Sequence, residues 1–69
     1  MSENVVNSVH KLRSLAKVTQ EELGCSVGVT RQTIIAIEKG NYTPSIMLAL
    51  KLAKFFKKPV DGLFKIKYE

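Results

Sequence analysis

Two helix-start signals lie close together in the middle of the chain, on either side of a glycine. Thr19 is followed three residues later by Glu22, and such a pair forms a capping box at the start of a helix. Thr30 is a second capping residue, and Gly28 lies between the two where a helix needs a left-handed residue to end. The spacing predicts two short consecutive helices joined by a tight turn, over residues 20–27 and 31–39.

Apolar residues recur at helical spacing on both sides of this pair. Val5, Val9 and Leu12 continue to Ala16 and predict a first helix over residues 4–16, with Asn4 as its cap. A fourth helix over residues 44–57 is predicted, with Pro44 in its first turn and its apolar face from Ile46 to Phe56. Pro59 separates it from a short fifth helix over residues 60–64. The tail then alternates apolar and basic residues up to Tyr68, which is typical of a strand.

The length of 69 residues leaves room for one domain only. The expected fold is therefore an all-α, compact domain of four to five helices that spans residues 1–69, with a C-terminal tail (65–69) that can form a strand. Cys25 is the single cysteine, so no internal disulfide can form. No stretch resembles a membrane span or a signal peptide, and a soluble, cytoplasmic protein is expected.

Composition indicates little about chemistry: its positive charge fits an anionic partner, but a small surplus of lysine also serves solubility. The chain carries 11 Lys and Arg residues against 6 Asp and Glu residues, a net charge of +5. No acid–base pair, nucleophile–base arrangement, phosphate loop or metal-ligand cluster is visible, so neither an enzyme nor a bound metal or cofactor is expected. No small-molecule ligand is evident from the sequence.

The two central helices predict a helix-turn-helix. Gly24 is small enough to let the 31–39 helix pass close over the 20–27 helix, and the apolar residues around the turn fill the space between them. The side left free on the second helix carries Arg31, Gln32, Thr33, Ile35 and Lys39. A helix presented in this way fits the DNA major groove, where Arg can pair with guanine and Gln with adenine.

In these segments the chain resembles the phage-repressor (Cro-like) or Xre-type helix-turn-helix proteins. The resemblance covers residues 12–64 and rests on "LRSLAKVTQEELG", "GVTRQTIIAIEKGNYTPS" and "ALKLAKFFKKPVDGLF". It implies a five-helix domain that binds double-stranded DNA sequence-specifically as a homodimer on a palindromic operator. Regulators of this kind are more often repressors than activators of transcription.

The resemblance also implies roles for individual residues. Arg31 and Gln32 are expected to read base edges, while Gln20 bonds a phosphate and braces the second helix of the motif. Arg13 and Glu38 are expected to form a partly buried, structural ion pair between the first and third helices. The full set of expected DNA-contacting residues is Gln20, Thr30, Arg31, Gln32, Thr33, Ile35, Lys39, Asn41 and Ser45.

Ile35 departs from the family pattern, in which a polar residue is usual at this position. Either it tilts into the core, or it contacts a thymine methyl group, or it touches a protein partner. The lysines of the fourth helix are expected to form a solvated face that attracts DNA at long range.

A dimer surface is expected on apolar residues of the C-terminal half. The expected residues are Leu48, Phe55, Leu63, Phe64, Ile66 and Tyr68. Each tail could pair with its partner's tail as a strand, pack on the neighbouring domain, or fray. The alternative functions are a protein-interaction module on the same fold and a DNA-binding antitoxin or restriction-control protein that acts with a partner.

Overall fold

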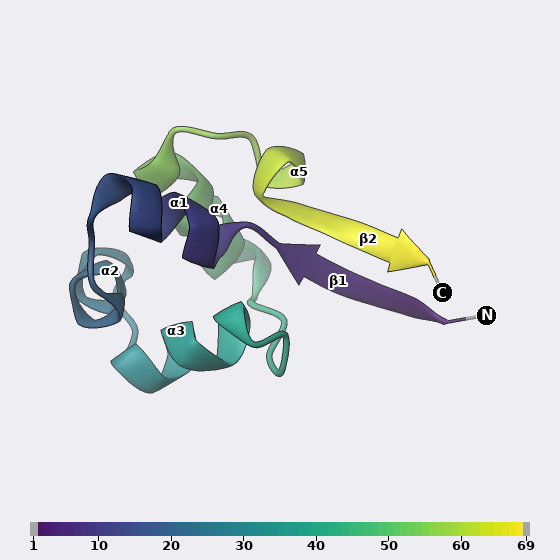
Figure 1. The fold of residues 1–69 in the computed structure, drawn as a ribbon, viewed down its shortest axis with the longest axis horizontal. Coiled ribbons are helices and arrows are strands. Elements are labelled where there is room, and N and C mark those ends of the chain that lie inside the picture. Colours follow the sequence, from purple (N-terminus) through teal and green to yellow (C-terminus); the bar gives the residue numbers. More distant parts are fainter. Residues whose placement is uncertain (1, 69) are drawn as a thin grey trace.

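In the computed structural model, residues 2–68 form five helices and a two-stranded antiparallel sheet. The sheet joins the two ends of the chain and projects from the helices (Figure 1). In chain order the elements are β1 (Glu3–Asn7), α1 (Val9–Ala16), α2 (Gln20–Val27), α3 (Arg31–Glu38), α4 (Ile46–Phe56), α5 (Val60–Leu63) and β2 (Phe64–Tyr68).

One apolar core holds the five helices together, and every helix contributes at least one side chain to it. Burying such side chains is the main source of stability in a domain of this size. The buried residues are Val9, Leu23, Val27, Ile34, Ile37, Leu48, Leu52, Ala53 and Leu63. Among residues 2–68, no helix is long and apolar enough to cross a membrane.

The helix-turn-helix forms where the sequence predicts it. The Thr19 side chain accepts a hydrogen bond from the Glu22 backbone N–H, and the Glu22 side chain accepts one from the Thr19 backbone N–H, which completes the capping box. Gly28 ends α2 in the left-handed region, at a φ of 79°. A Cβ added to Gly24 would lie 2.7 Å from the backbone oxygen of Val29, so only glycine allows this close approach of the turn to α2.

The prediction of a helix over residues 4–16 is wrong in its first half. Residues up to Asn7 form β1, and α1 begins only at Val9. Val5 and Val6 are β-branched, and β-branched residues favour strands when a partner strand is available. Asn4 therefore caps no helix. The Val9 backbone N–H is instead bonded by the Asn7 side-chain oxygen.

The tail forms β2 and pairs with β1 of the same chain, so the description as all-α needs correction. The register pairs Val5 with Ile66 and Asn7 with Phe64. Because paired residues share one side of a sheet, Val5, Phe64, Ile66 and Tyr68 lie together; we call them the apolar face of the sheet. Phe64 packs against the core, whereas Ile66 and Tyr68 are exposed. The tail is therefore not frayed, and the edge of β2 that faces β1 is occupied by this pairing.

The fourth helix is shorter than predicted. Pro44 does not lie in its first turn; Ser45 is the N-cap, and its side chain accepts a hydrogen bond from the Leu48 backbone N–H. A hydroxyl cap at this position satisfies an otherwise unpaired N–H of the first turn, and this sets the start of the helix at Ile46.

Two of the residues expected at an exposed dimer surface are buried instead. Leu48 is 7% and Leu63 1% exposed, because both point into the core from α4 and α5. Phe55 and Phe64 are half-buried against the same core. The apolar periodicity of a single helix does not distinguish a core stripe from an interface stripe.

Candidate nucleic-acid interface

The ion pair expected between Arg13 and Glu38 is present and ties α1 to α3. The Arg13 Nε donates to Glu38 Oε2 at 2.7 Å, and its Nη2 donates to Oε1 at 3.2 Å. The third guanidinium nitrogen, Nη1, donates to the backbone oxygen of Val18 at 3.0 Å. The Glu38 side chain is 6% exposed and that of Arg13 14%, so this bidentate pair is largely withdrawn from water.

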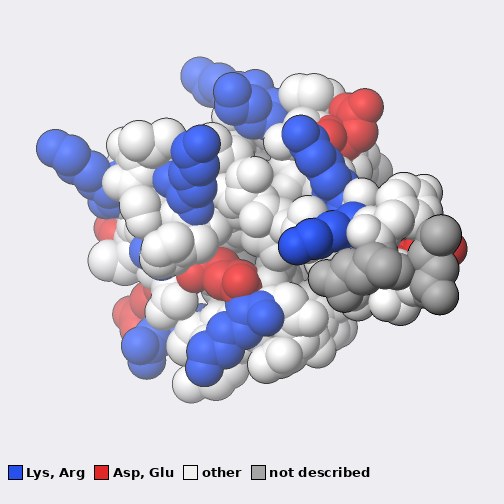
Figure 2. Space-filling view, turned by 45° about the vertical axis from the view of Figure 1, so that its right-hand side comes forward, with Lys and Arg blue, Asp and Glu red and all other residues white. Residues whose placement is uncertain are grey.

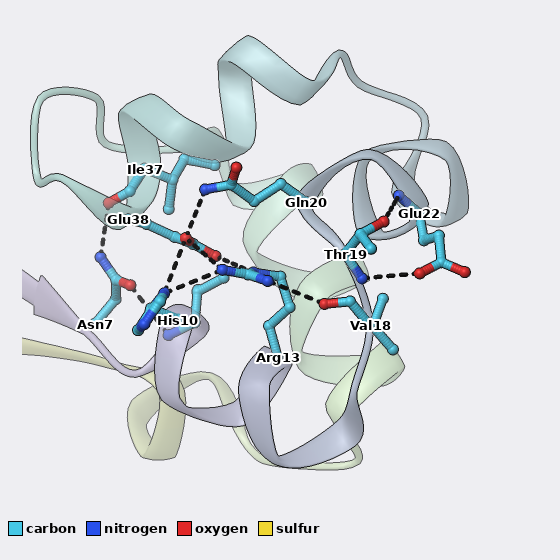
Figure 3. Close-up of polar contacts among 10 residues, drawn as sticks. Asn7, His10, Arg13, Val18, Thr19, Gln20, Glu22, Ile37 and Glu38 are labelled. Carbon is cyan, nitrogen blue, oxygen red and sulfur yellow. Dashed lines mark hydrogen bonds and ion pairs between the residues drawn. The ribbon is translucent and has the colours of Figure 1, made fainter.

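Gln20 and His10 extend this pair into a network across three helices (Figure 3). The Gln20 Nε2 donates to Glu38 Oε1 at 3.1 Å, which links the start of α2 to the end of α3. The His10 Nδ1 lies 3.0 Å from Arg13 Nη2 and 3.4 Å from Glu38 Oε1. Glu38 is thereby the centre of a cluster that fixes the orientation of α3 on α1 and α2.

The network changes the acidity of both partners of the ion pair. Burial alone would raise the pKa of the Glu38 carboxyl, but the hydrogen bonds from Arg13 and Gln20, the charge of Arg13 and the contact with His10 outweigh it. The pKa of Glu38 therefore lies below its ordinary value. The hydrogen bond to Glu38 also raises the pKa of Arg13, against a smaller lowering by burial. Both groups are charged at neutral pH.

Asn7 is a second anchor of α3, and sequence reasoning missed it. Its Nδ2 donates to the backbone oxygen of Ile37 at 2.9 Å, while its Oδ1 accepts from Val9. One side chain therefore gives the Ile37 carbonyl a second donor beside the Gly40 backbone N–H, and it satisfies the first N–H of α1. An asparagine just before a helix is a common sequence signal for the start of that helix. The contact of Asn7 with α3 has no such signal, because it depends on tertiary packing.

Most of the expected contact residues are exposed, and some of these also hold hydrogen bonds within the chain. Arg31, Gln32 and Lys39 are exposed along α3 and at its end. Thr30 caps α3, and its hydroxyl lies 3.1 Å from that of Thr33, so both threonines already have partners. Asn41 and Ser45 are exposed in the connection from α3 to α4.

Ile35 is half-buried and lies outside the apolar core cluster. Core residues of α3 are its neighbours Ile34 and Ile37, which are fully buried. The interpretation that Ile35 tilts into the core is therefore not supported by this packing. Its side chain keeps an accessible part on the same helix as Arg31 and Lys39.

These features match one family of proteins. The sequence model of the helix-turn-helix family aligns with residues 9–63, from the start of α1 to the end of α5. The chain belongs to the helix-turn-helix family. Membership of this family of transcriptional regulators implies DNA binding.

Relatives of this helix-turn-helix protein occur in bacteria and archaea. It is 49% identical over 63 residues to the uncharacterized HTH-type transcriptional regulator YgzD of Bacillus subtilis, covering 91% of this chain and 96% of that one. It is 52% identical over 58 residues to an uncharacterized HTH-type transcriptional regulator of Methanocaldococcus jannaschii, covering 84% and 88% of the two chains. The transcriptional repressor RstR of the cryptic phage CTXphi, from Vibrio cholerae, is 35% identical over 57 residues, which are 83% of this chain and 51% of RstR.

The fold also has a counterpart among solved structures. A crystal structure of a Bacteroides fragilis protein superposes with a TM-score of 0.78 at 18% identity, over 88% of this chain and 98% of the other. The shared architecture at this low identity concerns the fold alone.

Basic side chains of this helix-turn-helix protein are distributed over its surface. On the face shown in Figure 2, Lys and Arg side chains form several separate groups, with fewer acidic side chains between them. The net charge of +5 therefore comes from a distributed excess of lysine and arginine. Such a distribution favours attraction to a polyanion at long range without itself selecting a sequence.

Proposed function

We propose that this chain is a homodimeric transcriptional repressor that reads the major groove of an operator with α3. The observation that carries the proposal is the braced position of α3. Arg31, Gln32 and Lys39 are exposed on this helix, while Glu38 at its end is held by Arg13 and Gln20. A reading helix has to be presented rigidly, because misplaced side chains cannot form bidentate contacts to base edges.

Individual contacts follow from chemistry and position. Arg31 and Gln32, in the first turn of α3, are proposed to bond base edges, and Thr33 to contact a base or a phosphate. Lys39 and Asn41 are proposed to hold the DNA backbone after α3. At the start of α4, Ser45 lies at a helix N-terminus, which favours a phosphate through its dipole and its unpaired N–H groups.

Gln20 is proposed to contact a phosphate while it braces α3. One N–H of its amide donates to Glu38, and an amide NH₂ has a second N–H. Gln20 lines a shallow concavity together with Arg31, between the starts of α2 and α3. The bond to Glu38 would hold the Gln20 amide in place before DNA arrives.

Repression is proposed as the direction of control. RstR, which shares 35% identity over 57 residues, is named a transcriptional repressor. A protein that binds across a promoter blocks access to it, so occupancy is a sufficient mechanism.

The apolar face of the sheet is proposed as the dimer surface. Ile66 and Tyr68 are 55% and 64% exposed, and Val5 beside them is 39% exposed. Exposed apolar side chains that cluster on one side of a projecting sheet lose contact with water when a second copy covers them.

Ile66→Glu is expected to weaken the dimer about tenfold or more, because a charge then replaces an apolar contact. Lys65→Glu is the matched control, since residue 65 adjoins residue 66 but points to the opposite side of the sheet. Sedimentation equilibrium on the 7.7 kDa chain measures the effect. A wild-type chain that stays monomeric at all concentrations, with and without DNA, would contradict the proposed dimer.

Selection of bound sequences from random DNA duplexes tests the proposed function as a whole. We expect two symmetric half-sites about one helical turn apart, roughly 34 Å, with affinity that falls steeply as salt is added. Ile35→Ala is expected to relax one position, occupied by thymine, by roughly 1 kcal/mol. Enrichment of no sequence, with binding that is insensitive to salt, would instead support a protein-interaction module on the same fold.

A further inference from the structure

The first two turns of α4 expose three large apolar side chains that the proposed function does not use. Ile46 is 81%, Met47 67% and Leu50 54% exposed. Ile46 and Leu50 are four residues apart, so they lie one above the other on the same side of the helix. We call these three residues the α4 apolar patch. On the opposite side of α4, Leu48 and Leu52 fill the core, so the helix is apolar on two sides.

Lysines border this patch on one flank. The patch residues line a shallow concavity together with Lys51 and Lys54. Both lysines are exposed, and α4 contains no aspartate or glutamate from Ile46 to Phe56. The surface therefore offers an apolar strip with positive charge along its edge and no carboxylate from the same helix.

We propose that the α4 apolar patch docks an amphipathic helix of another protein, one with acidic residues beside its apolar stripe. An apolar stripe at helical spacing fits a row of exposed apolar side chains on a second helix, as in helix-in-groove recognition. Acidic residues along that stripe would meet Lys51 and Lys54, and this charge complementarity would favour correct partners over wrong ones.

Charge also decides between a foreign partner and a second copy. If two copies met through this patch, each would bring Lys51 and Lys54, and neither α4 would supply a carboxylate to pair with them. Lys57 and Lys58 follow directly and add to the positive charge at the end of the helix. Because like charges across an interface are unfavourable, an acidic partner fits the surface better than another copy does.

Two synthetic helices of roughly 18 residues serve as probes, long enough to form stable helices with suitable composition. Both carry leucines at helical spacing; one places glutamates beside the leucines and the other lysines. Fluorescence anisotropy measures their binding to the full chain, and amide chemical shifts of the ¹⁵N-labelled chain locate it. We expect the acidic helix to bind at least about tenfold tighter than the basic one, with shifts concentrated on residues 46–54.

Variants distinguish binding at this surface from nonspecific apolar binding. Leu50→Glu is expected to weaken binding of the acidic helix about tenfold or more. Leu15→Glu is the matched control, because Leu15 is a 71% exposed leucine on α1, and it should leave binding unchanged. The double variant Lys51→Glu, Lys54→Glu changes only exposed side chains, and it should reverse the preference in favour of the basic helix. Circular dichroism shows that each variant is folded. Retained DNA affinity is a second check for Leu50→Glu and Leu15→Glu only, because Lys51 and Lys54 add to the long-range attraction of DNA.

Three outcomes would overturn the proposal. In the first outcome, the acidic helix binds no tighter than the basic one. In the second, the chemical-shift changes lie on the sheet or on α3 rather than on α4. In the third outcome, Leu50→Glu lowers the mass of the protein alone in solution, and the patch then belongs to a contact between copies of this chain. None of these outcomes affects the proposed reading of DNA by α3.

Discussion

Replacing Glu38 by glutamine is expected to lower the free energy of unfolding by about 3 kcal/mol. The change is nearly isosteric, so it removes the charge while leaving the volume of the side chain in place. Arg13, which is only 14% exposed, would then keep a buried positive charge without its carboxylate partner. In a small domain such a loss shifts the melting temperature by more than about 10 °C. Thermal and urea unfolding measure it.

The pH dependence supplies a second readout for the same variant. Because the pKa of Glu38 is lowered in the folded state, its contribution is complete above the unfolded pKa of about 4.3 and disappears as the pH falls through the folded value. The stability difference between wild type and Glu38→Gln should therefore shrink below about pH 4.3. The pKa of Glu22 is also lowered, by its hydrogen bonds with Thr19. Because Glu22 is present in both proteins, its effect on the stability difference between them cancels.

Glu21→Gln is the matched control, because it removes one negative charge from an exposed site on α2. Surface substitutions of this kind change stability by less than about 0.5 kcal/mol. A loss of similar size in both variants would show that net charge, and not the network around Glu38, accounts for the effect.

Replacing Arg31 by alanine is expected to reduce affinity for the selected operator by roughly 10- to 100-fold, with little change in stability. The side chain is exposed in the first turn of α3, and a bidentate contact to guanine contributes about 1–3 kcal/mol of discrimination. The variant should also accept other bases at one position of each half-site. Anisotropy titrations on the operator and on single-base variants of it measure both effects.

Lys39→Ala and Lys58→Ala are the comparisons for this variant. Lys39 ends α3 and is proposed to hold a phosphate, so its loss should weaken binding to all sequences alike and reduce the salt slope by about 1. Lys58 lies beyond the C-terminal end of α4 and should have a small effect. Equal, sequence-independent losses in all three variants would mean that Arg31 acts only as a charge.

Local sequence signals were sufficient for the central part of the fold. The capping box at Thr19, the glycine turn at Gly28 and the cap at Thr30 define α2 and α3 within one residue of their observed ends. These signals depend on hydrogen bonds between residues three or four apart, so they can be recognised from residues close together in the sequence. The start of α3, and with it the place of Arg31 and Gln32 in its first turn, follows from the same signals.

The alternation of the tail indicated a strand, but the N-terminal strand and its pairing with the tail could not be predicted in this way. Val5 and Val9 fit a helical period, and the sequence near them does not show that Val5 pairs with Ile66 in a sheet. Strand pairing between residues this far apart depends on the tertiary fold. The same holds for the contact of Asn7 with α3, which arises once the helices have packed, whereas the family resemblance already implied that Gln20 braces this helix.

Pairing of β1 with β2 has a consequence for the order in which the protein can fold. The contact of Glu3 with Tyr68 spans almost the whole described chain, and β2 follows all five helices of residues 2–68. During synthesis β1 emerges before the five helices and has no partner until β2 has followed them. The helix-turn-helix can thus assemble from nearby residues before β1 and β2 pair. Because this pairing closes the longest loop among the described elements, we expect it to form last.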